Sequence, residues 1–193
     1  MPNDVIAVTV RVTNVLEALG VPYFIGGSLA STLYGMVRTT QDSDIIADLH
    51  AEHIPFLMDE LQNEFYMDDE MIADAIAQRS SFNIIHRESM FKVDIFIPRA
   101  RTFVNMQFSR ARKETLSSDP LMVAKVASPE DTLLAKLEWY RMGGEVSERQ
   151  WRDVLGVLKV QSEALDADYL HRMAREIQVE DLLDRALNLH GLV

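Results

Sequence analysis

The chain has 193 residues, of which 48% are hydrophobic and 25% charged, a composition typical of a globular protein with a sizeable core. Its 19 Lys and Arg against 30 Asp and Glu give a formal net charge of −11, which argues against the broad basic surface that grips nucleic acid. Without cysteine, disulfides, thiolate catalysis and Cys-based zinc sites are excluded. Without a visible secretory signal or an apolar run of about 18 residues, we expect a cytoplasmic protein.

Apolar periodicity and turn residues predict alternating helices and strands in the first two thirds of the chain. Gly20 follows the first helical pattern, where a helix would end, and Ser28 is placed to cap the second helix. In chain order we expect a helix at 5–19, a strand at 23–25, a helix at 28–34, a strand at 43–48, helices at 52–64 and 68–78, and strands at 82–86, 91–97 and 121–126.

From residue 128 the pattern becomes helical. Ser128 is a cap residue, Pro129 suits the first helical position, and two glycines at 143–144 end the helix. Further helices are expected near 147–159, 166–176 and 179–189. We therefore expect a mixed first part at 1–127 and a helical region at 128–193.

A glycine pair followed by two carboxylates is the most informative pattern in the chain. Gly26 and Gly27 come directly after the expected strand at 23–25, and Asp42 and Asp44 follow later with one residue between them. Side chains two apart on a strand point to the same side, so the two carboxylates repel each other unless a cation accompanies them. Oxygen ligands of this kind favour Mg²⁺, which often carries a phosphate with it.

A third carboxylate, Asp94, lies on the expected strand at 91–97. Alternation puts Lys92, Asp94 and Phe96 on one side of that strand and apolar residues on the other. A carboxylate next to a core is expensive to bury unless it is paired or bound to metal. Taken alone, Asp94 has a simpler explanation that stays open, an exposed ion pair with Lys92 or with another cation.

Together, the carboxylates and the glycines predict a phosphoryl-transfer site. Two metal ions about 4 Å apart can hold the attacking and the leaving oxygen in line at a phosphorus atom. Asp42 and Asp44 can hold both ions, and Asp94 can bind the ion that activates the attacking hydroxyl or accept its proton. The glycine pair lets backbone amides approach phosphate, and a helix start near Ser28 favours an anion.

In this order and strand context, the residues resemble the DNA polymerase β-type nucleotidyltransferase superfamily. Its pattern is a Gly-Gly or Gly-Ser turn, an Asp-x-Asp or Asp-x-Glu pair and a later strand carboxylate. The matching segments are 26–28, 38–44 and 92–94. The chain resembles small prokaryotic members, including abortive-infection toxin-like nucleotidyltransferases. These also carry a helix like the one beginning at Pro129 and a later Arg-x-x-Asp-like segment, here 149–153.

The resemblance implies an α+β fold, a nucleotidyltransferase-like twisted mixed β-sheet flanked by helices with a helical C-terminal part. It implies Mg²⁺-dependent transfer of a nucleoside monophosphate from a nucleoside triphosphate (NTP) such as ATP to a hydroxyl or phosphate acceptor. By position, Asp42 and Asp44 match the metal-binding pair and Asp94 the third carboxylate. These three are the expected catalytic residues.

The residues expected to contact the nucleotide are Gly26, Gly27, Ser28, Arg38 and Lys136. Of these, Gly27 and Ser28 match the phosphate turn of the superfamily. Arg38 either fixes the loop before the carboxylate pair or meets a phosphate. Lys136 matches a basic residue that reaches the phosphates, and its alternative is pairing with Glu130 or Tyr140 on its own helix.

Three other features are expected to affect packing more than chemistry. Ser43 lies between the paired carboxylates, where the superfamily usually has an apolar residue, and points away from them. Trp139, Tyr140 and Trp151 are expected to pack between helices, with stacking on a base as the lesser alternative. One cluster of basic residues is expected to form a solvated surface, and it consists of Arg99, Arg101, Arg110, Arg112 and Lys113.

The acceptor is not encoded in any motif, and a small molecule such as an aminoglycoside, a tRNA end or a protein all remain open. The acidic net charge leans against tRNA. No membrane partner is expected. A toxin role would add a cognate antitoxin as a partner, and a homodimer is the other possibility.

Two other function classes are open. A phosphatase or sugar-nucleotide transferase is disfavoured because residues 45–47 continue a strand after the carboxylate pair instead of turning. A non-catalytic nucleotide-binding or partner-binding module with the same fold is disfavoured because all three carboxylates are present.

Overall fold

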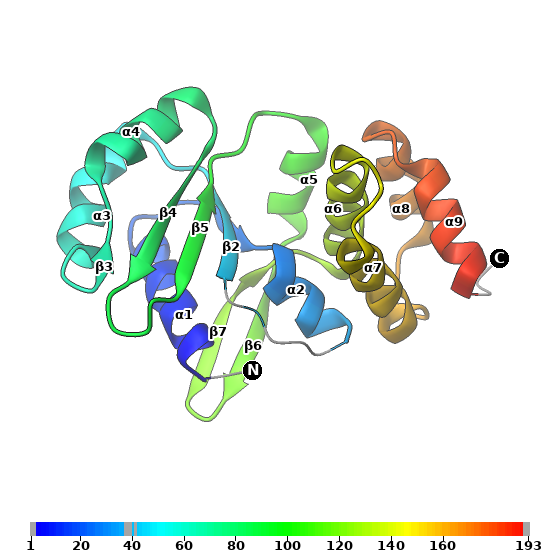
Figure 1. Cartoon of the computed structure of the whole chain (residues 1–193), viewed down its shortest axis with the longest axis horizontal. Helices are drawn as coiled ribbons and strands as arrows, with labels where there is room; N and C mark the ends of the chain where they lie inside the picture. Colours follow the sequence, from blue (N-terminus) through cyan, green and yellow to red (C-terminus); the bar gives the residue numbers. More distant parts are fainter. Residues whose placement is uncertain (1–2, 37–39, 41, 191–193) are drawn as a thin grey trace.

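The computed structural model describes residues 3–36, 40 and 42–190 (Figure 1). Arg38, one of the predicted phosphate contacts, lies outside the described residues. The strands are β1 (Tyr23–Ile25), β2 (Asp42–Ala47), β3 (Phe65–Tyr66), β4 (Ser81–His86), β5 (Lys92–Phe96), β6 (Arg112–Ser118) and β7 (Leu121–Val126). The helices are α1 (Asn3–Ala18), α2 (Gly27–Tyr34), the 3-10 turn η1 (Ala51–His53), α3 (Ile54–Leu61), α4 (Asp69–Gln78), α5 (Thr102–Arg110), α6 (Pro129–Met142), α7 (Glu148–Gln161), α8 (Ala167–Glu176) and α9 (Glu180–His190). None of these described helices is long and apolar enough to cross a membrane.

In the described part of the chain, the strands form one seven-stranded mixed sheet in the order β3-β4-β5-β2-β1-β7-β6. At its centre, β2 is antiparallel to β1 and parallel to β5. The β4–β5 and β6–β7 pairs are antiparallel, whereas β1 and β7 run parallel. The predicted α+β architecture with a mixed sheet is confirmed.

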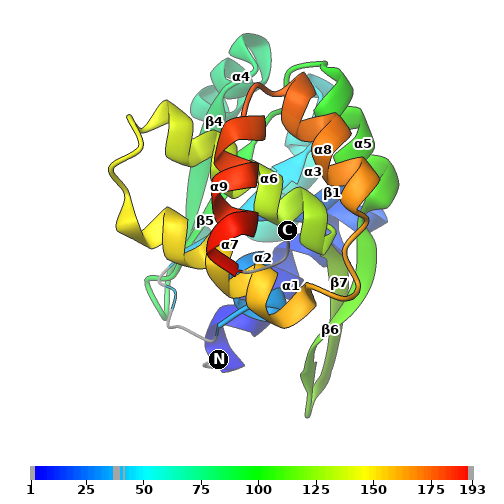
Figure 2. The ribbon, with the colours of Figure 1, turned by 90° about the vertical axis from the view of Figure 1, so that its right-hand side faces the viewer.

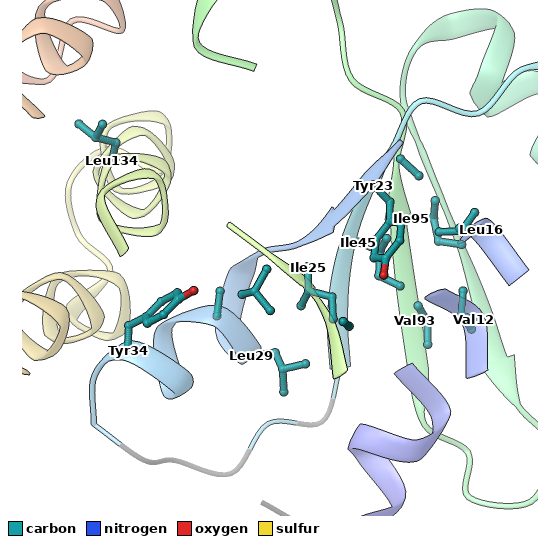
Figure 3. Packing of buried hydrophobic residues seen from close by; sticks show 14 of the residues in the cluster. Val12, Leu16, Tyr23, Ile25, Leu29, Tyr34, Ile45, Val93, Ile95 and Leu134 are labelled. Carbon is teal, nitrogen blue, oxygen red and sulfur yellow. The ribbon is translucent and has the colours of Figure 1, made fainter. Parts of the chain in front are cut away.

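Helices cover both faces of the central strands. On one face, Val12 and Leu16 of α1 lie against Ile45 and Val93 of the sheet (Figure 3). On the other face α2 packs on β2, and α6 and α7 pack on α2 (Figure 1). The helices α8 and α9 add an outer layer on α6 and α7 (Figure 2). Buried residues of these C-terminal helices, such as Leu134, belong to the same hydrophobic cluster as the sheet.

Three elements were not predicted from the sequence: β3, α5 and β6. The strand β6 has the sequence Arg-Lys-Glu-Thr-Leu-Ser-Ser, and only Leu116 in it is buried. Its position at the edge of the sheet explains this, because an edge strand can be held by backbone pairing to β7 without an apolar face. The expected helix at 52–64 is shorter in the structure, with the 3-10 turn preceding α3.

The expected solvated basic surface is wrong for Arg110. Its Nη2 lies 3.0 Å from Oε2 of Glu130, whose side chain is 3% exposed, and its guanidinium lies 3.8 Å from the centre of the Tyr169 ring. The Tyr169 hydroxyl in turn donates to buried Asp131. This network joins α5, α6 and α8, so the basic residue serves packing between helices.

Replacing Ser43 with alanine is expected to raise the free energy of unfolding by about 1 kcal/mol. Ser43 is completely buried on the core face of β2, as predicted from the alternation, and its Oγ has no hydrogen-bond partner among the described residues. Urea unfolding measures the effect. Ser31→Ala is the matched control, because the buried Ser31 hydroxyl donates to the Ser28 carbonyl at 3.1 Å. The loss of this hydrogen bond should lower the free energy of unfolding. A loss of stability in Ser43→Ala would contradict the prediction.

Candidate active site

Three carboxylates lie on one side of two adjacent parallel strands. On β2 and β5, partly exposed residues alternate with fully buried ones, and the register pairs Asp44 with Asp94 and Asp42 with Lys92. Residues paired in parallel strands point to the same side of the sheet. The Thr40 hydroxyl lies 3.2 Å from Oδ1 of Asp42, which helps to orient that carboxylate. The structure thus brings together Asp42, Asp44 and Asp94.

The glycine turn at 26–28 encloses the side chain of Asp44. The Gly26 N–H donates to the main-chain oxygen of Asp44 at 2.9 Å, and the Ser28 nitrogen lies 3.4 Å from its Oδ2. Gly27 has a φ of +53°, and a Cβ there would collide with Oδ2 of Asp44, so only glycine fits. The N-cap of α2 is Gly26 and not Ser28 as predicted, which places the Ser28 N–H in the first helical turn, directed at the carboxylate.

Burial raises the pKa of Asp44, and the negative charge of Asp42 raises it further. The Ser28 N–H and the positive charge of Lys136 act in the opposite direction, and Asp94 adds to the increase. A divalent cation bound by Asp42 and Asp44 would relieve this repulsion. Because the donors are all oxygens, the pair fits Mg²⁺ in its ligand chemistry.

Asp94 is paired with Lys92. The Lys92 Nζ lies 2.7 Å from Oδ2 of Asp94, and the side chains are 42% and 19% exposed. This is the simpler explanation that the sequence left open for Asp94 considered alone. Within the described ranges, no three Asp, Glu or His side chains are placed so that they could hold a metal ion together. As it stands, the site offers a carboxylate pair and a third carboxylate engaged by an ammonium.

Lys136 is buried beside this site, and its partner was not anticipated. Its Nζ lies 2.9 Å from Oδ2 of Asp153 on α7, with both side chains less than a tenth exposed. The expected alternative, pairing with Glu130 or Tyr140 on its own helix, therefore did not identify this contact. In the sequence, Asp153 stands out only as part of the Arg-x-x-Asp-like segment 149–153. The signal for its burial was the apolar run that follows it on α7, which includes Val154.

An open strip of the sheet continues from the carboxylates toward α6. Asn83 on β4 is exposed and lies opposite Asp94 in the register. Phe96 follows on β5, and the ring of Trp139 lies 6.4 Å from its ring in an edge-on arrangement. Trp139 is 51% exposed, so the prediction that it packs between helices is wrong for this residue. Tyr140 and Trp151 do pack together, with ring centres 5.2 Å apart.

Comparison with known proteins shows likeness in structure only. No family model matches the chain, and no curated protein matches significantly in sequence. An antigenic nucleotidyltransferase-like protein from Paracoccidioides brasiliensis is 17% identical, with a TM-score of 0.55 over 96% of this chain and 93% of its own. The antibiotic-resistance factor ANT(2'')-Ia is 13% identical, with a TM-score of 0.50 over 99% of this chain and 97% of its own. The chain thus has a nucleotidyltransferase-like fold.

Proposed function

We propose that the protein is an Mg²⁺-dependent nucleotidyltransferase that moves a nucleoside monophosphate from an NTP to a hydroxyl or phosphate acceptor. The observation that carries the proposal is the register of β2 and β5, which sets Asp44 and Asp94 side by side next to the glycine turn. The nucleotidyltransferase-like fold supports the proposal. The order of the glycine turn and the three carboxylates supports it too, because it resembles the sequence pattern of the DNA polymerase β-type superfamily.

Asp42 and Asp44 would hold the Mg²⁺, which when bound withdraws charge from the phosphates and orients them. The amides at 26–28 and the start of α2 would bind phosphate oxygens. The acceptor oxygen forms a bond to the α-phosphorus while the bond to the bridging oxygen breaks, and pyrophosphate leaves with that electron pair. With a hydroxyl acceptor, the released proton passes to the carboxylate of Asp94.

Lys136 is proposed to face the nucleotide phosphates from α6. Its positive charge already acts on Asp44, which supports a position close to the bound nucleotide. The Lys136–Asp153 ion pair would hold the ammonium in place. Arg38, which precedes Asp42 in the sequence, is proposed as a second phosphate contact.

We propose that the acceptor enters along the open strip next to Asp94. Asn83 offers an exposed amide there, and Trp139 an exposed ring. This supports a small acceptor more than tRNA, which the net charge of −11 also disfavours. A toxin that modifies a protein is the other version of the proposal, and it predicts transfer to a macromolecule.

The alternative function is a non-catalytic nucleotide-binding module. The observation that favours it is the ion pair between Lys92 and Asp94, which occupies the carboxylate that would accept the proton. Such a module would bind Mg²⁺ and NTP without transferring anything, so binding and transfer must be measured separately.

Transfer of label from α-labelled NTPs is expected to require Mg²⁺ and to fall about 10²-fold or more in Asp42→Asn and Asp94→Asn. The assay offers each NTP with aminoglycosides, tRNA or cell lysate as acceptor. Asp94→Asn should still be stabilised by Mg²⁺ and NTP in a thermal shift, whereas Asp42→Asn should not.

Asp48→Asn is the control. Asp48 directly follows β2, but its carboxylate pairs with Arg79, at 3.0 Å, and not with the residues of the site. Binding of Mg²⁺ and NTP without transfer to any acceptor would favour the module. Absence of Mg²⁺-dependent NTP binding would refute the proposed function.

A further inference from the structure

We propose that the Lys92 ammonium takes the place of a second divalent ion, so that the active site binds one divalent ion per chain. The ion would be held by Asp42 and Asp44, while Asp94 keeps its partner Lys92. This inference rests on the proposed function and revises the two ions that the carboxylate motif predicts.

The position of Lys92 carries the inference. It lies two residues before Asp94 on β5, on the same side of the sheet, and opposite Asp42 in the register of β2 and β5. Its Nζ contacts Oδ2 of Asp94 at 2.7 Å. The negative charges of Asp94, Asp42 and Asp44 all act on this ammonium. A positive charge is therefore already present where a second metal ion would need to bind Asp94.

The charge of the site supports one divalent ion. Before a nucleotide binds, the three carboxylates carry three negative charges, which a single Mg²⁺ and the Lys92 ammonium balance. A second divalent ion would have to displace the ammonium from Asp94 or share the carboxylate with it, and like charges this close repel strongly.

The single-ion site gives Asp94 and Lys92 distinct roles. Asp94 accepts the acceptor proton directly, because no metal ion is needed to activate that hydroxyl. Lys92 is a positioning residue that holds Asp94 near the α-phosphorus.

Counting bound Mn²⁺ tests the inference without measuring activity. The full chain is titrated with Mn²⁺ in the presence of an α,β-methylene NTP, with the base that the label assay selects, and free Mn²⁺ is read by electron paramagnetic resonance. We expect one Mn²⁺ per chain in the wild type and two in Lys92→Met, where Asp94 is released. Lys159→Met, at an exposed position on α7, should keep one.

Two Mn²⁺ in the wild type would overturn the inference and leave the proposed function standing. One Mn²⁺ in a folded Lys92→Met, checked by circular dichroism, would also overturn it, because the ammonium would then not exclude an ion. No bound Mn²⁺ in the wild type would instead refute the metal-dependent function itself.

Discussion

Asp44→Asn is expected to stabilise the metal-free protein while reducing nucleotide transfer by about 10²–10³-fold. Asparagine has nearly the same shape as aspartate, and its side-chain oxygen can still accept from the Ser28 N–H. It removes a negative charge that burial and the charge of Asp42 make unfavourable. We expect a gain on the order of 1 kcal/mol, or about 2–4 °C in the thermal midpoint. The lost metal ligand accounts for the loss of activity.

The stabilisation should depend on pH in a defined direction. The pKa of Asp44 is raised above its ordinary value of 3.8, chiefly by burial. A carboxyl with a raised pKa contributes stability in full below about pH 3.8, and that contribution is lost as the pH rises through the folded-state pKa. The advantage of Asp44→Asn should therefore be largest near neutral pH and shrink toward about pH 4. Urea unfolding in EDTA across this range measures it.

The matched control is Asp48→Asn. Asp48 is ion-paired with Arg79 and its side chain is 40% exposed, so its removal should lower stability by less than about 1 kcal/mol and leave transfer intact. A loss of stability in Asp44→Asn near neutral pH would contradict the electrostatic account. If Mg²⁺ and NTP stabilised that variant as much as the wild type, Asp44 would not be a metal ligand.

Local sequence patterns predicted the parts of the site that depend on short-range rules. The strand Tyr23–Ile25 and the alternation that puts Asp42 and Asp44 on one side follow from residues within each strand. The register that sets Asp44 beside Asp94 does not, because parallel pairing joins segments about fifty residues apart and depends on the whole sheet. The sequence therefore identifies the three carboxylates, and the structure shows how they are placed relative to one another.

The glycine turn shows how a correct motif can have an additional physical reason. The sequence explains Gly26 and Gly27 by the approach of phosphate. The structure adds that a side chain at Gly27 would strike Asp44. The need for glycine at this position is therefore set in part by a carboxylate seventeen residues away, which no local pattern reveals.

Long-range polar contacts were the least predictable part. Arg110 reads as a surface residue because its partners Glu130 and Asp131 belong to a helix about twenty residues later. Similarly, no local pattern in the sequence links Lys136 to Asp153. Only the packing of α6 on α7 removes both from water and makes each require the other.

Lys136→Met is expected to lower the free energy of unfolding by about 3–5 kcal/mol. Methionine fills much of the same space but leaves the charge of Asp153 buried opposite an apolar side chain. Asp153→Leu should cost a similar amount, because it leaves the ammonium buried without this carboxylate. In Lys136→Met/Asp153→Leu both charges are removed, and most of the lost stability should return. Urea unfolding of the four proteins gives the coupling energy, which should exceed about 1 kcal/mol.

The same cycle separates the structural role of Lys136 from its proposed role at the phosphates. If the ammonium only secures α6 against α7, the stable double variant should recover transfer along with stability. If it also binds the nucleotide, the double variant should fold well and still transfer label slowly, with a raised KM for the NTP. Additive losses in the two single variants would contradict the ion pair itself. The expected result is restored stability without restored transfer, because the charge that holds α6 in place also acts on Asp44.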